Sequence, residues 1–258
     1  MENCKIYNED CLIGLDKLED NSLDLIVTSP PYYNVKDYSH WNSYDEYLNW
    51  LKSVFTLIFN KLKSGRMCCV NISTFIIPRK SRNSESQRIA LPFHFVNLME
   101  NIGYKFLEDI IWEKPDGAVK NRNGKFSQHR QPVAYKPNVV NEYIFVFQKP
   151  ADFLIDKIVR NYKDKTDSLI KDGYERTNIW KINPETKSKH PAPFPYKLAE
   201  NLILYYSYID DLICDPFLGS GTTARAAIYN KRNFIGYEIN EEFYKLSTKF
   251  LNRRELKL

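Results

Sequence analysis

The chain has 258 residues with a formal net charge of +5, and 43% of its residues are hydrophobic. This length accommodates one α/β domain with an insertion, and this composition excludes an intrinsically disordered chain. No apolar run approaches the ~20 residues that span a membrane, and the first residues do not resemble a signal peptide. The five cysteines and four scattered histidines predict neither a disulfide framework nor a zinc site. We therefore expect a reduced, cytoplasmic protein with no metal and no membrane partner.

Strands and helices alternate along most of the chain. A strand from about residue 5 is followed by a helix from about Cys11 to Leu18 and by the apolar run Leu23–Val27, which is typical of a buried strand. Apolar residues at helical spacing predict a helix over Tyr44–Leu62. We further expect strands over Met67–Ile72, Ile110–Trp112, Tyr143–Phe147, Leu212–Cys214 and Phe234–Tyr237, and helices over Leu91–Ile102, Leu198–Tyr206, Ala224–Ile228 and Glu241–Leu251. This alternation predicts an α/β fold with a mostly parallel sheet.

A polar and aromatic cluster, Thr28-Ser29-Pro30-Pro31-Tyr32, ends the strand Leu23–Val27. Its two prolines cannot continue a hydrogen-bonded ladder, so the strand stops there. The carboxyl end of a strand in an open α/β sheet is where ligands usually bind. The Ser29 hydroxyl and the free carbonyls can accept hydrogen bonds from an amino group, and Tyr32 can stack on a flat ring. A nucleobase has both features, although a proline-capped strand entering a turn would also explain the cluster taken alone.

A glycine-rich turn, Asp215–Thr223, follows the strand Leu212–Cys214. Gly219 and Gly221 let the backbone approach a ligand closely, and the helix that follows presents free N–H groups. The next strand ends at Glu238, whose carboxylate can accept both hydroxyls of a ribose. The order of strand, Gly-x-Gly turn, helix, strand and acid predicts a site for a nucleoside-containing cofactor.

Together the two clusters resemble the signatures of the amino-methylating DNA methyltransferases that use S-adenosylmethionine. That family's catalytic signature is Asp, Asn or Ser followed by Pro-Pro and an aromatic residue, here Ser29–Tyr32, and its cofactor signature is matched by Asp215–Thr223. The catalytic motif comes first, which is the circularly permuted order of the family's β group. Asn8–Leu12 resembles the acidic segment before the catalytic strand. His190–Pro195 resembles the His-Pro segment before the cofactor loop, with His-Pro-Ala-Pro-Phe-Pro in place of the family's His-Pro-Thr-Gln-Lys-Pro.

The resemblance, which extends from about residue 5 to 250, implies a doubly wound Rossmann-like sheet and a single methyltransferase domain over residues 1–258. The strands before Thr28 and before Asp215 would be neighbours in that sheet. The implied reaction is methyl transfer from S-adenosylmethionine, without a metal, to the exocyclic amine of a base flipped out of DNA. Ser at the first motif position favours N4 of cytosine, with N6 of adenine as the alternative. A restriction endonuclease of the same specificity is an expected partner, and the chain is expected to be a monomer or a homodimer.

The resemblance also assigns residues to the two halves of the site. The Ser29 hydroxyl and the Pro30 carbonyl would accept the hydrogens of the amine, and Tyr32 would stack on the base. Asp215 would hold the methionine end of the cofactor, and Glu238 its ribose. Asp10 is equally compatible with a cofactor contact and with a helix N-cap. The full catalytic set is Ser29, Pro30, Pro31 and Tyr32, and the full cofactor set is Asp10, Thr28, Asp215, Phe217, Gly219, Ser220, Gly221, Thr222 and Glu238.

Two aperiodic segments, 113–141 and 151–190, are expected to be DNA-contacting insertions. For 151–190 the family resemblance implies target recognition, and an irregular surface segment packed by Phe153 and Trp180 explains its sequence equally well. Between Lys114 and Lys136 six basic residues are opposed by a single acid, Asp116, and a second basic cluster begins at Arg79. Loops of one sign beside a cleft suit a phosphate backbone. The residues expected to contact DNA are Arg79, Lys80, Arg82, Lys120, Arg122 and Lys125.

Other function classes explain the sequence less well. A nicotinamide-dependent oxidoreductase would require Gly-x-Gly-x-x-Gly, but Ala224 occupies the third glycine position. A P-loop nucleotidase is excluded because the Gly-Lys-Ser/Thr signature is missing. The remaining alternatives are an RNA or protein amine methyltransferase and a catalytically silent DNA-binding module, although the intact cofactor loop argues against the silent module.

Overall fold

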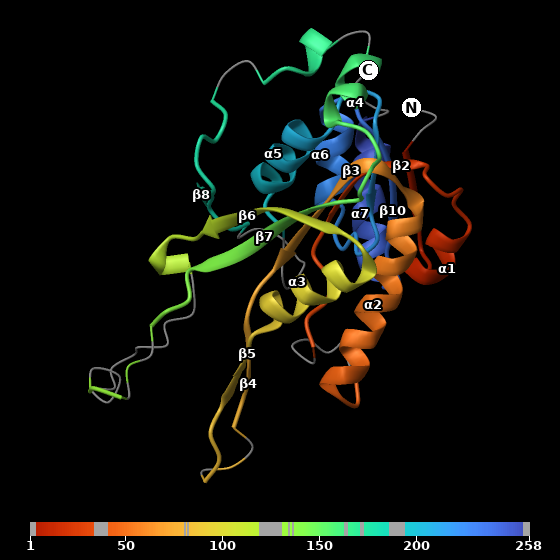
Figure 1. The fold of residues 1–258 in the computed structure, drawn as a ribbon. Coiled ribbons are helices and arrows are strands. Elements are labelled where there is room, and N and C mark those ends of the chain that lie inside the picture. The colour runs from red at the N-terminus through yellow and green to blue at the C-terminus, as the bar shows by residue number, and fades with distance from the viewer. Residues whose placement is uncertain are drawn as a thin grey trace.

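The computed structural model describes residues 4–33, 41–79, 81, 83–118, 131–133, 135, 137–162, 165–170, 173–185 and 194–254. Its core is an eight-stranded sheet in the order β1-β10-β9-β2-β3-β7-β6-β8 (Figure 1). All neighbours in this sheet pair in parallel except β7, which is antiparallel to both β3 and β6. The strands are β1 (Cys4–Tyr7), β2 (Leu23–Thr28), β3 (Leu62–Ile72), β6 (Lys105–Glu113), β7 (Asn141–Gln148), β8 (Ile179–Lys181), β9 (Leu212–Asp215) and β10 (Asn233–Tyr237).

The strand order reverses between β2 and β9. From β2 the chain continues outward to β3, and from β9 it continues in the other direction to β10. The two strands are parallel neighbours, with Leu25 opposite Ile213 and Ile26 opposite Cys214, which confirms the predicted adjacency. Ligands of doubly wound sheets bind outside the carboxyl ends of the strands at such a switch point. The predicted Rossmann-like fold is therefore confirmed, and the switch point lies between the two sequence motifs.

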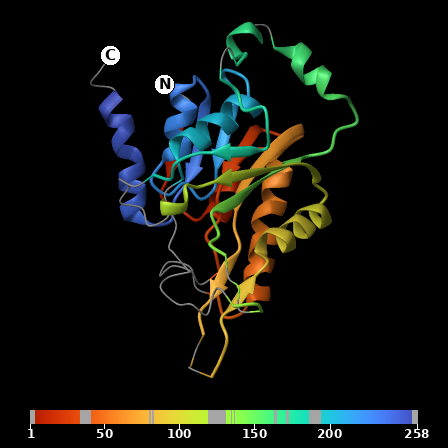
Figure 2. The same ribbon diagram turned by 90° about the vertical axis from the view of Figure 1, so that its left-hand side faces the viewer.

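Helices cover both faces of the sheet (Figure 2). One face carries α1 (Cys11–Asp16), α2 (Tyr44–Lys61) and α3 (Leu91–Ile102), and the other carries α5 (Tyr196–Tyr206) and α6 (Thr222–Tyr229). Helix α7 (Glu241–Arg254) contacts β1 and α6. Within the described part of the chain, none of the helices combines the length and apolar character that a bilayer crossing requires.

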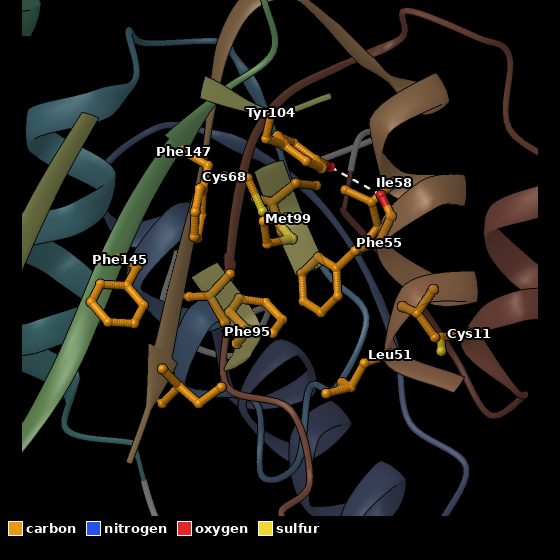
Figure 3. Packing of buried hydrophobic residues seen from close by; sticks show 14 of the residues in the cluster. Cys11, Leu51, Phe55, Ile58, Cys68, Phe95, Met99, Tyr104, Phe145 and Phe147 are labelled. Atoms are coloured by element: carbon orange, nitrogen blue, oxygen red, sulfur yellow. Dashed lines mark hydrogen bonds between the residues drawn. The ribbon is translucent and has the colours of Figure 1, made fainter. Parts of the chain in front are cut away.

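Each face of the sheet has its own hydrophobic core because side chains alternate along the strands. On β7, Phe145 and Phe147 face the core under α2 and α3, whereas Ile144 and Val146 face the core under α5 and α6. Figure 3 shows the first core, where Phe55 and Phe95 meet edge to face with ring centroids 4.9 Å apart. The buried Tyr104 hydroxyl in this core donates to the Phe55 carbonyl at 3.1 Å, so burying it leaves no unpaired polar group.

The long predicted elements are confirmed with small shifts of their ends. Helix α3 ends at Gly103 as expected, because Gly103 adopts φ 117, a left-handed conformation that favours glycine. The predicted strands Met67–Ile72 and Ile110–Trp112 are longer in the structure. Not predicted were the hairpin of β4 (Phe75–Ile77) and β5 (Gln87–Ile89), the edge strand β8 and the helix α4 (Ile155–Asn161), nor the short 3-10 segments Asp116–Ala118 and Lys165–Ser168.

The direction of the antiparallel strand β7 determines which loops lie beside the switch point. The β4–β5 hairpin and the segment after β6 leave from the carboxyl edge of the sheet, and the hairpin projects from the body of the molecule (Figure 1). Since β7 runs the other way, the chain after Gln148 emerges at the amino edge. There Tyr162 contacts Arg66 and Asp211, and the Ser168 hydroxyl accepts from the Ile209 amide at 3.0 Å. The first part of the predicted insertion 151–190 thus packs at the edge opposite the switch point.

Candidate active site

A cleft of about 660 Å³ lies at the carboxyl ends of β2, β3, β9 and β10. Both sequence motifs line it, so residues nearly two hundred positions apart share one site. Its volume is within the range of roughly 300–1,000 Å³ that small-molecule sites occupy. The predicted site residues along its wall are Asp10, Thr28, Ser29, Pro30, Pro31, Tyr32, Asp215, Phe217, Gly219, Ser220, Thr222 and Glu238.

Asp215 connects the two motifs. Its carboxylate, in a residue only 3% exposed, accepts from the Thr28 hydroxyl at 2.6 Å, the Thr223 hydroxyl at 2.7 Å and the Phe217 amide at 3.0 Å. Burial raises the pKa of Asp215 to about 6, against the lowering effect of these hydrogen bonds. The carboxylate therefore fastens the end of β2 to the cofactor loop, and its predicted contact with a cofactor's methionine end stays a prediction.

The cofactor loop depends on two glycines. Gly219 has φ 56 and Gly221 has φ 88, both in the left-handed region that side chains with a Cβ rarely adopt. Gly219 lines the cleft, as do its neighbours Ser220 and Thr222, whereas Gly221 is buried at the start of α6 and is not part of the cleft wall. We therefore assign Gly221 to the backbone turn that places the loop.

Glu238 closes the loop from the next strand. Its Oε2 accepts from the Gly219 amide at 2.7 Å and its Oε1 from the Asn240 amide at 2.8 Å. Burial raises the pKa of the Glu238 carboxyl, and the two amide hydrogen bonds oppose this rise. Each carboxylate oxygen has a second lone pair, so the group can accept further hydrogen bonds from the cleft. This arrangement suits the predicted ribose contact.

Asp10 has a structural role in addition to its place on the cleft wall. It is the N-cap of α1, and its Oδ1 accepts from the Leu12 amide at 2.8 Å. An acidic N-cap satisfies one of the amides that a helix start leaves unpaired. Both interpretations of Asp10 derived from the sequence are therefore compatible with its position.

Ser29 and Tyr32 of the predicted catalytic motif make hydrogen bonds along one wall of the cleft, and a side-chain hydrogen bond joins the two residues. The Ser29 hydroxyl donates to Asn71 Oδ1 at 3.3 Å, and the Tyr32 hydroxyl donates to Glu142 Oε2 at 3.3 Å. Lys114 pairs with the other oxygen of Glu142, and its ammonium lies 4.4 Å from the centroid of the Trp112 ring. Burial, and next the Glu142 carboxylate, hold the pKa of Tyr32 well above its usual range. The phenol therefore remains a donor.

Several cleft residues were not predicted from the sequence. Asn71 lies near the end of β3 at the same edge where Thr28 ends β2, so the rule that found Ser29 would also have found Asn71. Glu142 and Lys114 could not be placed in this way, because their position depends on the direction of β7. The unpredicted residues of the cleft wall include Trp41, Trp50, Asn71, Trp112, Lys114, Glu142, Ile239 and Asn240.

The predicted DNA-contacting residues fall mostly outside the described part of the chain. Lys80, Arg82, Lys120, Arg122 and Lys125 all lie outside the described residues, as do positions 190–193 of the His-Pro segment. Arg79 is exposed just after β4, on the hairpin at the cleft edge of the sheet. The two predicted insertions differ in position. Segment 113–141 begins at the cleft edge, whereas residues 151–162 and 165–170 pack at the far edge; among the described residues of the second insertion, Pro184 and Glu185 line the cleft.

Comparison with known proteins assigns this chain to a family. A family model described as DNA methylase, of the N6/N4 type, matches residues 23–249. The type II beta methyltransferase M.BslI of Bacillus sp. (strain NEB-606) is 30% identical over 253 residues, which cover 94% of this chain but only 27% of M.BslI. The chain thus spans about a quarter of the length of that relative.

Two solved structures share the fold. TTHA0409 from Thermus thermophilus, a putative DNA modification methylase complexed with S-adenosyl-L-methionine, superposes with a TM-score of 0.73 at 23% identity, covering 97% of this chain and 93% of that one. The PvuII DNA methyltransferase (cytosine-N4-specific) superposes with a TM-score of 0.72 at 23% identity, covering 95% and 85%. With the family match over most of its length, the chain belongs to the N6/N4 DNA methylase family.

Proposed function

We propose that this protein transfers a methyl group from S-adenosylmethionine to the exocyclic N4 amine of a cytosine flipped out of DNA. The observation that carries this proposal is that the Ser29 motif and the cofactor loop line one cleft and are joined by the Thr28–Asp215 hydrogen bond of 2.6 Å. That bond holds the half of the cleft around Ser29–Tyr32 (the Ser29 half) beside the half around the cofactor loop (the loop half), as a group transfer between two bound molecules requires.

The residues of the loop half fit the methyl donor. Glu238 keeps acceptor capacity for ribose hydroxyls, and the exposed Ile239 next to it offers an apolar surface to the adenine. Gly219 leaves room for close approach of the backbone, and the Phe217 ring, 5.5 Å from that of Trp50, borders the path towards the Ser29 half. When bound there, S-adenosylmethionine supplies an electrophilic methyl group and leaves as S-adenosylhomocysteine.

The residues of the Ser29 half can activate a weak nucleophile. The lone pair of a cytosine amine is delocalised into the ring, so the amine attacks only if its N–H bonds are drawn out of plane and the positive charge on nitrogen is stabilised. The Ser29 oxygen and the Pro30 carbonyl can accept the two hydrogens, and the Tyr32 ring can stack on the base. Such electrostatic preorganisation is worth ~3–4 kcal/mol for one well-placed group. Because the amine is out of reach inside a duplex, the base must be flipped out.

Three observations favour cytosine over adenine. Serine stands at the first motif position, as in the family members that mostly methylate cytosine, and the PvuII enzyme with a similar fold is described as cytosine-N4-specific. In addition, the Lys114 ammonium lines the cleft next to the Tyr32–Glu142 contact. Cytosine has two acceptors, N3 and O2, in line beyond its amine, whereas adenine has N1 and then a C–H group. If the Lys114 ammonium faces the base edge beyond the amine, it is therefore more complementary to cytosine.

The biological role is inferred from the relatives. M.BslI is a type II methyltransferase, which supports a role in restriction-modification, with DNA as the substrate and a restriction endonuclease as partner. DNA contacts are proposed for the β4–β5 hairpin and for segment 113–141, which leave from the cleft edge of the sheet. Function on chromosomal DNA in a bacterial host also agrees with a cytoplasmic location.

The experiment that tests the proposal offers methyl-labelled S-adenosylmethionine to the purified protein with DNA, RNA and protein from one host. We expect label in DNA, incorporated about 100- to 1,000-fold more slowly when Ser29 is replaced by Ala. Label confined to RNA or protein would show that a related amine methyltransferase activity is present instead. Failure to bind S-adenosylmethionine in calorimetry would identify a catalytically silent DNA-binding module.

A further inference from the structure

The Ser29 hydroxyl can act in two opposite ways, because a serine hydroxyl is a donor as well as an acceptor. Only the acceptor role assists methyl transfer, since the amine must give its own hydrogen to the Ser29 oxygen. If the hydroxyl proton pointed at the amine, it would compete for the nitrogen lone pair that attacks the methyl group. Something in the cleft must therefore direct the Ser29 proton away from the base.

Asn71 on β3 is placed to take that proton. Asn71 is 3% exposed, and its Oδ1 accepts a hydrogen bond from the Ser29 hydroxyl at 3.3 Å. The orientation of its amide is set from the other side, where Nδ2 donates to the Tyr143 carbonyl on β7 at 3.2 Å. Because a backbone carbonyl can only accept, the NH₂ group must face Tyr143 and the oxygen must face Ser29.

Tyr32 is another neighbour of Ser29, and a side-chain hydrogen bond joins the two. Burial raises the pKa of Tyr32, and this hydrogen bond opposes the rise. In this bond the Tyr32 oxygen is a second acceptor for the Ser29 proton, so it acts in the same direction as Asn71. The Tyr32 hydroxyl donates to Glu142 Oε2 at 3.3 Å, and Lys114 pairs with the other carboxylate oxygen. The Glu142 carboxylate of this ion pair can only accept hydrogen bonds. The protons of both hydroxyls in the Ser29 half are thus directed towards fixed acceptors in the protein.

We propose that Asn71 is a positioning residue of methyl transfer: it holds the Ser29 proton so that a lone pair of Ser29 Oγ faces the target amine. The proposal rests on the proposed function, since it assumes that Ser29 accepts a hydrogen of that amine. A carboxylate at position 29 has no proton at neutral pH and would need no such partner. The dependence on Asn71 is therefore a specific consequence of serine at this position.

The test is a double-mutant cycle on turnover with saturating S-adenosylmethionine. Asn71→Leu, which keeps the side-chain shape, should lower kcat about 10- to 100-fold, somewhat less than the 100- to 1,000-fold typical for removal of a whole catalytic hydrogen-bonding group. The KM for S-adenosylmethionine should change less than about threefold. In a Ser29→Ala background, followed by single-turnover measurements, Asn71→Leu should have no further effect, because the proton that it orients is gone. In a Ser29→Asp background the loss should also be small.

The controls separate positioning from packing. Asn201→Leu removes an equally buried amide, 2% exposed on α5 and outside the cleft wall, and should leave kcat unchanged. If Asn71→Leu does not fold, Asn71→Ala replaces it in the same cycle. If Asn71→Leu lowered turnover by the same factor in the Ser29→Ala background as in the natural protein, the proposal would be overturned. Failure of the proposed function is seen separately, in the unmodified protein. That protein would then show no methyl transfer, or N6-methyladenine as its product, before any variant is made.

Discussion

At the scale of single residues, the site is defined by the direction of its hydrogen bonds. The Asp215 carboxylate accepts three hydrogen bonds and that of Glu238 accepts two, whereas the Ser29 hydroxyl donates to Asn71 and the Tyr32 hydroxyl donates to Glu142. The sequence could predict Ser29, Asp215 and Glu238, because each follows an apolar strand in a motif. It could not predict these directions, which arise from residues on other strands such as Asn71 and Glu142.

Tyr32 provides a first prediction. Its ring lines the cleft while its hydroxyl donates to Glu142, so ring and hydroxyl can be tested separately. Tyr32→Ala should lower turnover at least about 100-fold while S-adenosylmethionine affinity stays within a few-fold, because base stacking is worth ~1–3 kcal/mol and the orientation of the base is also lost. Tyr32→Phe, the matched control, keeps the ring and should retain more activity. Turnover near the normal rate in Tyr32→Ala would show that the ring does not hold the base.

Asp215 provides a second prediction, on pH. Its pKa is raised to about 6 by burial, so between its unfolded value near 4 and about pH 6 the folded protein binds more protons than the unfolded one. The free energy of unfolding must therefore fall as pH rises through this window, by at most about 3 kcal/mol from this group. Asp211, whose pKa is also raised to about 6, acts in the same direction.

The measurement is denaturant unfolding of the natural protein and of Asp215→Asn from pH 4 to pH 7. The stability of the natural protein relative to Asp215→Asn should be greatest near pH 4, should fall as pH rises to about 6, and should change little above pH 6.5. In the same variant the cofactor loop loses an acceptor for Thr28, Thr223 or the Phe217 amide, so weaker S-adenosylmethionine binding is expected at neutral pH. Parallel pH profiles for both proteins would contradict the assignment of this titration to Asp215.

At the scale of elements, whether the sequence predicts a helix or strand depends on how that element is stabilised. Helix α2 and strand β2 bury long periodic or continuous apolar runs, so their own sequences define them. The three-residue strand β8 buries only Trp180 and exists because it pairs with β6. The hairpin strands β4 and β5 likewise depend on each other. Such pairing cannot be derived from local periodicity, and neither can the reversed direction of β7.

The amino edge of the sheet carries the prediction at this scale. Arg66 on β3, 8% exposed, pairs with Asp24 on β2 at 2.9 Å and with Asp211 before β9 at 3.1 Å. Arg66→Met would leave the buried Asp211 carboxylate without its cation and Asp24 with Lys63 alone, and should lower the free energy of unfolding by about 3–5 kcal/mol. Lys63→Met, which removes a cation with a 43% exposed side chain from the same Asp24, should cost less than about 1 kcal/mol. Equal losses in the two variants would contradict a central role for Arg66.

At the scale of the whole molecule, the switch point puts the cleft and the basic elements on the same edge of the sheet. The hairpin with Arg79 and the start of segment 113–141 lie there, whereas residues 151–162 and 165–170 lie at the opposite edge. DNA that presents a base to the cleft would therefore meet the hairpin and the start of segment 113–141. The fold class and the pairing of the motifs could be predicted from the sequence, but the position of the residues after β7 could not, because it follows from the direction of that strand.

This arrangement predicts the salt dependence of DNA binding. Replacement of Arg79, Lys80, Arg82, Lys120, Arg122 and Lys125 by Ala should flatten the slope of log affinity against log salt by about 0.9 for each phosphate that the protein no longer neutralises. A matched variant at the far edge, with Lys157 and Arg160 of α4 replaced by Ala, should leave the slope unchanged. The reverse result, with a slope that responds only to the α4 variant, would place DNA on the opposite edge of the sheet.

Methyl transfer to N4 of cytosine at the Ser29 half of the cleft can be tested on DNA from living cells. The most direct measurement digests DNA from cells that carry the natural gene or its Ser29→Ala variant, and from cells without it, to nucleosides for separation by mass spectrometry. We predict N4-methyldeoxycytidine only in DNA from cells with the natural gene. N6-methyldeoxyadenosine as the only new nucleoside would contradict the target base, and N4-methyldeoxycytidine from the Ser29→Ala variant at an undiminished level would contradict the role of Ser29.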